Sequence, residues 1–219
     1  MYPNWPTLLY KGIIPGPQEN WLDFEKRALY LLNLPENEDL KDSLDIVEDI
    51  FQMRPSWASC CYTKKGLTLL EAAATFIDDD YRVKIHIKPY FLQRKRLLFY
   101  KKNEIIAHEM IHAIRAVFEE PVFEEFLASR VFKSFWRRFF GSLIEKRKDL
   151  LLLAIPGVSL LSFLFFIGRL SYKTRLWKKK DHPSPLCLTD NEIRKGFISQ
   201  SDGPRGALLD FLYCEKNSK

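Results

Sequence analysis

Two histidines and a glutamate in the middle of the chain have the types and the spacing to hold a metal ion and use it. They form the pattern His-Glu-x-x-His at His108, Glu109 and His112. Residues four apart on a helix share one face, so both imidazoles can reach a single zinc ion. Glu109, one step around the helix, leans toward the water molecule that such a metal would hold. The spacing therefore predicts two metal ligands and a general base that takes a proton from water.

The surroundings of this pattern predict the helix that it needs. Asn103 is a good N-cap, Glu104 suits the positive end of the helix dipole, and Pro121 ends the helix just beyond Glu120. Apolar residues at helical spacing give the helix a buried face: Ile105, Ile106, Ile111, Ile114, Val117 and Phe118. The alternative is that both histidines are core residues satisfied by ordinary hydrogen bonds, with Glu109 at the surface.

A catalytic zinc ion needs a third protein ligand and keeps one position open. No other histidine is close in the sequence, because His86 lies upstream and His182 lies beyond a long apolar stretch. A carboxylate on the next helix, predicted at residues 122–140, is the better candidate. Glu124 and Glu125 lie near the edges of the apolar side of that helix, where an acidic side chain needs a partner.

At this point the sequence resembles the gluzincin branch of the zinc metallopeptidases. In that branch, His-Glu-x-x-His on one helix is completed by a glutamate on a following helix. The stretch from Glu125 through Ala128 to Ser129 is similar to the Glu-x-x-Ala-Asp/Asn signature of several gluzincin families, with serine where Asp or Asn is usual. The resemblance covers residues 82–130.

The resemblance implies a hydrolase with one catalytic Zn²⁺ that cleaves a peptide bond in a peptide or protein substrate. It implies that His108, His112 and Glu125 hold the zinc and that Glu109 is the general base. Glu124 remains the other candidate for the third ligand. A second function is a membrane-associated binding or scaffold protein whose metal site does no chemistry, but Glu109 argues against it because a structural site has no use for that acid.

The residues around the predicted metal site are less defined. Arg115 lies three residues after the second histidine and is expected to orient the third-ligand carboxylate from behind; an ion pair with Glu119 is the alternative. The group that stabilises the developing negative charge on the substrate stays open. Its candidates are Tyr90, His86 and His182.

The elements before the zinc helix predict an α+β fold with a short mixed sheet. Helical periodicity covers residues 18–33 and 39–53, and strand patterns cover 56–62, 75–77 and 82–88. The last of these alternates strictly between apolar and polar residues, so we expect a half-buried strand at a sheet edge. An extended peptide substrate would add to such an edge as one more strand. The alternative is an ordinary solvated edge that its charged residues keep from pairing.

The chain divides into four parts. Residues 1–17 are rich in Pro and Gly and predict an irregular arm, and residues 18–140 hold the zincin-like domain with its zinc helix and its ligand helix. An apolar segment follows at residues 150–168. Residues 171–219 form a basic tail with short helices and no residues that suggest chemistry.

The apolar segment carries no charge and is barely long enough to cross a bilayer as a helix. Basic residues flank it on both sides, which favours contact with lipid headgroups and leaves the orientation open. We predict a transmembrane helix and a membrane-associated protein, single-span or re-entrant, with lipid as a partner. The alternative is a buried hairpin broken at Pro156-Gly157 in a cytoplasmic protein.

Composition and charge bear on possible nucleic-acid partners and on the compartment of the protein. The chain has 219 residues with 34 Lys and Arg against 28 Asp and Glu, a net charge of +6. No motif that reads DNA or RNA accompanies this charge, so no nucleic-acid partner is predicted. The start of the chain predicts no signal peptide, and the four cysteines show no Cys-x-x-Cys spacing, which favours free thiols in a reducing compartment.

Overall fold

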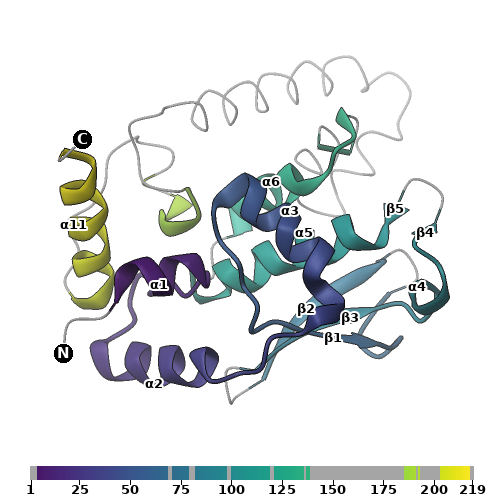
Figure 1. Ribbon diagram of the computed structural model, residues 1–219, viewed down its shortest axis with the longest axis horizontal. Coiled ribbons are helices and arrows are strands. Elements are labelled where there is room, and N and C mark those ends of the chain that lie inside the picture. Colours follow the sequence, from purple (N-terminus) through teal and green to yellow (C-terminus); the bar gives the residue numbers. More distant parts are fainter. Residues whose placement is uncertain are drawn as a thin grey trace.

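The structure is a computed structural model of α+β class, with helices packed around a small mixed sheet (Figure 1). The residues that it describes are 4–68, 71–78, 82–97, 100–118, 121–135, 137–138, 185–190, 192 and 203–217.

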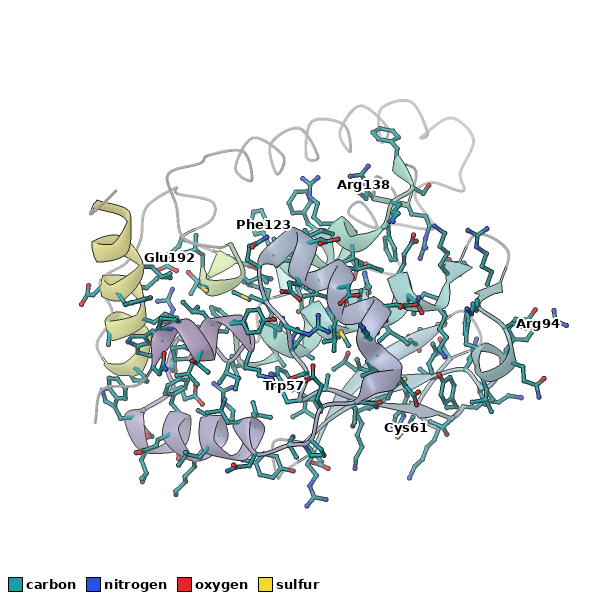
Figure 2. All side chains as sticks on the ribbon, viewed as in Figure 1. Trp57, Cys61, Arg94, Phe123, Arg138 and Glu192 are labelled. Carbon is teal, nitrogen blue, oxygen red and sulfur yellow. The ribbon has the colours of Figure 1, made fainter. Side chains whose placement is uncertain are left out.

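The N-terminal residues are part of the core. Residues 4–17 were expected to be irregular, but they contain helix α1 (Trp5–Tyr10) and a buried run that includes Ile13 and Ile14, each 1% exposed. Trp57, in the centre of Figure 2, donates from its ring nitrogen to the carbonyl of Lys11 at 2.6 Å. The Pro and Gly content of this arm therefore reflects tight packing against neighbouring elements.

Two amphipathic helices follow, close to the predicted positions. Helix α2 (Trp21–Leu32) buries Phe24, Ala28 and Leu31, whereas Trp21 at its start is 45% exposed. A short 3-10 helix, η1 (Glu38–Leu40), leads into helix α3 (Lys41–Phe51). The apolar side chains of α3 point into the core at helical spacing: Leu44, Val47 and Phe51.

The sheet has three strands in the order β1-β3-β2. Strand β3 (Val83–Ile87) pairs in parallel with β1 (Ser59–Tyr62) and antiparallel with β2 (Ala73–Ile77). The prediction that residues 82–88 form an edge strand is therefore wrong, because β3 is the central strand. The apolar and polar residues of β3 alternate because one face of the strand is buried and the other is more exposed. A central strand shows this alternation just as an edge strand does when only one side of the sheet is covered. Within the described sheet, β1 and β2 form the edges.

The helix that carries the His-Glu-x-x-His pattern lies at the centre of the fold. Helix α4 (Tyr90–Gln93) and the two-stranded hairpin β4 (Arg96–Leu97) and β5 (Tyr100–Lys101) connect the sheet to helix α5 (Lys102–Arg115), which continues as the 3-10 turn η2 (Ala116–Phe118). Helix α5 contacts β2 and β3, and it also contacts α3 and α6 (Figure 1). Most of its residues are buried as a result.

The helix after α5 is shorter than the predicted span of residues 122–140. Helix α6 (Pro121–Ala128) passes into the 3-10 turn η3 (Ser129–Val131), and the chain then becomes extended at Phe132. Phe135, which lies within that predicted span, is 63% exposed. The early end has a local reason, because extended backbone at Phe132 lets its ring stack on the imidazole of His108 at 5.1 Å between centroids.

The C-terminal residues return to the same core. The 3-10 turn η4 (Pro185–Cys187) contacts α5, and helix α11 (Gly203–Asn217) contacts α2, with Leu208 and Leu209 buried. The described residues before residue 139 and those at 185–190, 192 and 203–217 thus pack into the same core.

The predicted fold class also included a transmembrane helix, and this part of the prediction is wrong for the described residues. Among the residues that the structure describes, no helix combines the length and the apolar character needed to cross a bilayer. The segment at residues 150–168, on which that prediction rested, lies outside the described residues.

Candidate metal centre

A cleft of about 420 Å³ lies between the edge strand β2 and the helices α5 and α6. Strand β2 lines it with Ala73, Ala74, Thr75 and Ile77. The helices line it with the residues of the predicted site: His108, Glu109, His112, Ala116, Glu124 and Glu125. The cleft therefore brings the His-Glu-x-x-His pattern, the two candidate glutamates and the outer edge of the described sheet to one place.

Three side chains converge in this cleft as a set of metal donors. The Nε2 atoms of His108 and His112 are 3.1 Å apart. The carboxylate oxygens of Glu125 lie 3.5 Å from the first of these atoms and 3.4 Å from the second. Donors that bind zinc at 2.0–2.1 Å in a tetrahedron are about 3.3 Å from one another. The two histidines and Glu125 therefore fit a zinc ion in both chemistry and spacing.

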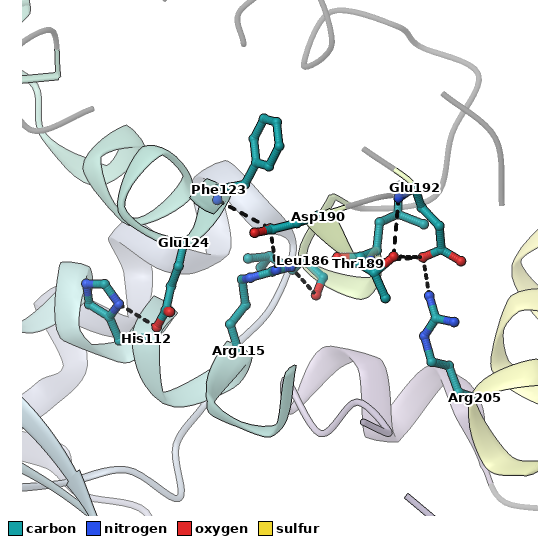
Figure 3. A network of polar contacts seen from close by, with 10 residues as sticks. His112, Arg115, Phe123, Glu124, Leu186, Thr189, Asp190, Glu192 and Arg205 are labelled. Carbon is teal, nitrogen blue, oxygen red and sulfur yellow. Dashed lines mark hydrogen bonds and ion pairs between the residues drawn. The ribbon is translucent and has the colours of Figure 1, made fainter. Parts of the chain in front are cut away.

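Glu124 contacts a different atom of the same histidine. Its Oε1 is 2.7 Å from Nδ1 of His112 (Figure 3), whereas Nε2 of the same ring is the atom near His108. A carboxylate on the second nitrogen fixes the tautomer and the orientation of a metal-binding histidine. The choice between Glu124 and Glu125, which the sequence leaves open, thus has a geometric answer: Glu125 faces both Nε2 atoms, and Glu124 supports the ring of His112 from behind.

The charges in the cleft act on one another. Burial opposes protonation of His112, but its hydrogen bonds to Glu124 and Glu125 and the charge of Glu109 outweigh burial and raise the pKa of His112 to about 10. Burial alone would raise the pKa of Glu125, but the contacts with His108 and His112 hold the pKa of that carboxyl well below its usual range. The cleft thus stabilises positive charge between its carboxylates, which is the electrostatic requirement of a cation site.

The predicted general base is held by a residue that sequence reasoning missed. Glu109 is buried, at 8% exposure, and the hydroxyl of Thr75 lies 2.9 Å from its Oε2 and 2.9 Å from its backbone carbonyl. Thr75 is 34 residues away in the sequence, on strand β2. Only the packing of β2 on α5 reveals this contact, because a lone threonine in a strand pattern gives no signal of it.

The first histidine is held differently from the second. Nδ1 of His108 is buried without a hydrogen-bond partner in the described part of the chain, and the stacked ring of Phe132 covers the imidazole. Ser129, which stands where the resemblance expects Asp or Asn, donates its hydroxyl to the carbonyl of Phe126 at 2.9 Å. The departure from the gluzincin signature thus leaves this hydroxyl bonded within its own turn.

Arg115 points away from the cleft. It was expected behind the third-ligand carboxylate, but its guanidinium donates to the carbonyl of Leu188 at 2.8 Å and lies 3.4 Å from a carboxylate oxygen of Asp190 (Figure 3). The carboxylate contact behind His112 is made by Glu124. The alternative partner of Arg115, Glu119, lies outside the described residues.

The candidates for stabilising charge on the substrate do not line the cleft where the structure describes them. His86 pairs in register with Ala74, on the sheet face opposite to Thr75, and its Nδ1 lies 2.9 Å from the carbonyl of Lys65. Tyr90 is on α4, where Arg94 contacts both its hydroxyl and its ring. His182 lies outside the described residues.

Comparisons with protein families, with curated proteins and with solved structures found no match to this chain. The functional reading therefore depends on the residues and the geometry of the cleft.

Proposed function

We propose that this chain is a zinc-dependent peptidase of gluzincin type. The observation that carries the proposal is the convergence of His108 Nε2, His112 Nε2 and the carboxylate of Glu125, with Glu109 in the same cleft. A purely structural zinc site is closed by four protein ligands and needs no acid beside it. Three ligands, an open cleft and a buried glutamate support a site that activates water.

The roles of the residues follow from their positions. Zinc bound by the two histidines and Glu125 supplies Lewis acidity, which lowers the pKa of water toward neutrality and polarises a carbonyl group. Glu109 accepts a proton from water in the cleft and returns it to the leaving amine. The hydroxyl of Thr75 contacts Oε2 of Glu109, which leaves Oε1 available for that transfer.

The free edge of β2 suits an extended peptide substrate. Strands β2 and β3 are antiparallel, and hydrogen bonds run from Asp78 N to Arg82 O and from Lys88 N to Ala72 O. These bonds show that the even-numbered residues of β2 are the ones that hydrogen-bond to β3. Residues between these positions with odd numbers, such as Thr75 and Ile77, therefore direct their N–H and C=O groups away from β3. A peptide that pairs with this edge runs along the cleft, so the proposed substrate edge is β2 in place of residues 82–88.

The first experiment is zinc analysis of the purified protein and its variants. We expect about one zinc per chain in the wild type, and its loss in His112→Ala and Glu125→Ala. Glu109→Gln is expected to keep the zinc and to lose activity by about 100-fold or more on a mixture of peptides analysed by mass spectrometry. A wild type that cannot be loaded with zinc contradicts the proposal. Full zinc content with equal activity in Glu109→Gln supports the binding or scaffold function.

A further inference from the structure

A segment from the C-terminal part of the chain contacts both helices that carry the proposed metal ligands. Oδ1 of Asp190 accepts from the guanidinium of Arg115 at 3.4 Å and from the backbone N–H of Phe123 at 3.3 Å (Figure 3). Arg115 is the last residue of α5, and Phe123 is the third residue of α6. Asp190 is 8% exposed and Arg115 is 1% exposed, so this bridge lies in the interior.

The contact with α6 is made at the first turn of the helix. The N–H groups in the first turn of a helix have no partner within the helix, and a carboxylate there also favours the helix dipole. Helix α6 has eight residues, and the two residues after Phe123 are Glu124 and Glu125. A shift of this first turn would therefore move both carboxylates relative to the histidines.

We infer that Asp190 is a positioning residue of the metal site, which fixes the first turn of α6 against the end of α5. This inference rests on the proposed function, since it assigns Asp190 a role in presenting Glu124 and Glu125 to the zinc site. The carboxylate acts through the backbone of α6 and through Arg115.

The same segment supplies a matched control. Glu192 forms a second buried ion pair, with Arg205 on α11, and both side chains are 3% exposed. Glu192 accepts from Arg205 and from Thr189 in its own segment. Replacing either carboxylate removes an ion pair from a buried arginine, which destabilises the fold. The loss of Asp190 also removes an acceptor from the backbone of α6.

The experiment compares Asp190→Ala, Asp190→Asn and Glu192→Ala in the full-length chain. Zinc affinity is measured by competition with a chelator, and the coordination geometry is read from the visible absorption spectrum of the cobalt(II)-loaded proteins. We expect Asp190→Ala to bind zinc about tenfold or more weakly and to show an altered cobalt spectrum. Asp190→Asn keeps an oxygen acceptor and restores both readouts. Glu192→Ala loses stability but keeps the affinity and the spectrum of the wild type.

Other outcomes overturn the inference. Wild-type affinity and spectrum in Asp190→Ala would show that Asp190 is only part of an ion pair, and an equal loss in Glu192→Ala would show a general effect of instability; the proposed function stands in both cases. A wild type that binds no zinc overturns the proposed function and this inference with it. If Asp190→Ala does not fold, the pair Arg115→Met with Asp190→Leu removes both charges and the acceptor together, and weak zinc binding is again the expected result.

Discussion

Glu124 and Glu125 are neighbours in the sequence but contact different atoms of the proposed metal site. A helix turns by about 100° per residue, so consecutive side chains leave it in different directions. Glu125 reaches the Nε2 atoms of both histidines, and Glu124 reaches Nδ1 of His112. The two carboxylates should therefore differ in what their loss does to zinc binding.

We expect Glu124→Ala to lower zinc affinity by about 10- to 100-fold, because His112 loses the acceptor that orients its ring. Glu124→Gln keeps an oxygen near Nδ1 and should lie between this variant and the wild type. A chelator competition titration measures both values. If Glu124→Ala abolishes zinc binding while Glu125→Ala retains it, Glu124 is the third ligand and the assignment must be reversed.

Thr75 offers a separate test of the general base. Thr75→Val keeps the shape of the side chain and removes the hydroxyl that contacts Oε2 of Glu109. We expect unchanged zinc content and a kcat lower by about 10- to 100-fold, because a displaced base transfers the proton poorly. Thr75→Ser keeps a hydroxyl and is the matched control. An equal kcat in the valine variant would show that the contact does not orient Glu109.

At the scale of elements, the free edge of β2 is the feature with the clearest consequence. The side chain of Ile77 is 49% exposed, and its N–H faces away from β3. Proline is tolerated at the N–H positions of edge strands that face solvent, so its substitution there removes one donor without breaking the sheet.

We therefore expect Ile77→Pro to raise KM for a peptide substrate with little change in zinc content, since one main-chain hydrogen bond to the substrate is lost. Steady-state kinetics on the best-cleaved peptide from the activity screen measures this effect. Ile77→Val keeps the N–H group and serves as control. Equal KM values in the proline variant and the control would place the substrate away from this edge.

The sequence predicts elements well where periodicity is local. It located α2, α3, β3 and the helix α5 to within a few residues, and it brought forward the side chains that converge in the cleft, because spacing along one helix determines which residues share a face. It did not predict the neighbours of β3, since alternation reports faces and says nothing about strand order. It also missed Thr75 and Asp190, which reach the site from 34 and 67 residues away along the chain.

At the scale of the whole molecule, segments from both ends of the chain complete one core. The N-terminal arm packs against η2, the turn that follows α5, where a Cβ added at Gly16 would lie 2.8 Å from the carbonyl oxygen of Val117. Helix α11 contacts α2. A basic tail without chemical motifs looks dispensable in the sequence, yet its apolar residues Leu208 and Leu209 are buried.

We expect Leu208→Ala to destabilise the whole protein by about 2–5 kcal/mol in a single cooperative transition, because the leucine is 1% exposed and its removal leaves a cavity in the shared core. Asp210→Ala, at an exposed position of the same helix, should change stability by less than about 0.5 kcal/mol. Urea unfolding followed by circular dichroism measures both. A separate early transition for the tail would show that α11 is not part of the common core.

The bridge from Asp190 to α6 also bears on the order in which the protein is made. A ribosome that adds 5 to 20 residues per second needs roughly 3 to 13 seconds to pass from Glu125 to Asp190. During that interval the ligands are already in the chain, but the carboxylate that fixes α6 does not yet exist. If the proposed function holds, the nascent chain would lack a well-formed metal site until Asp190 had been added and could bond to α6.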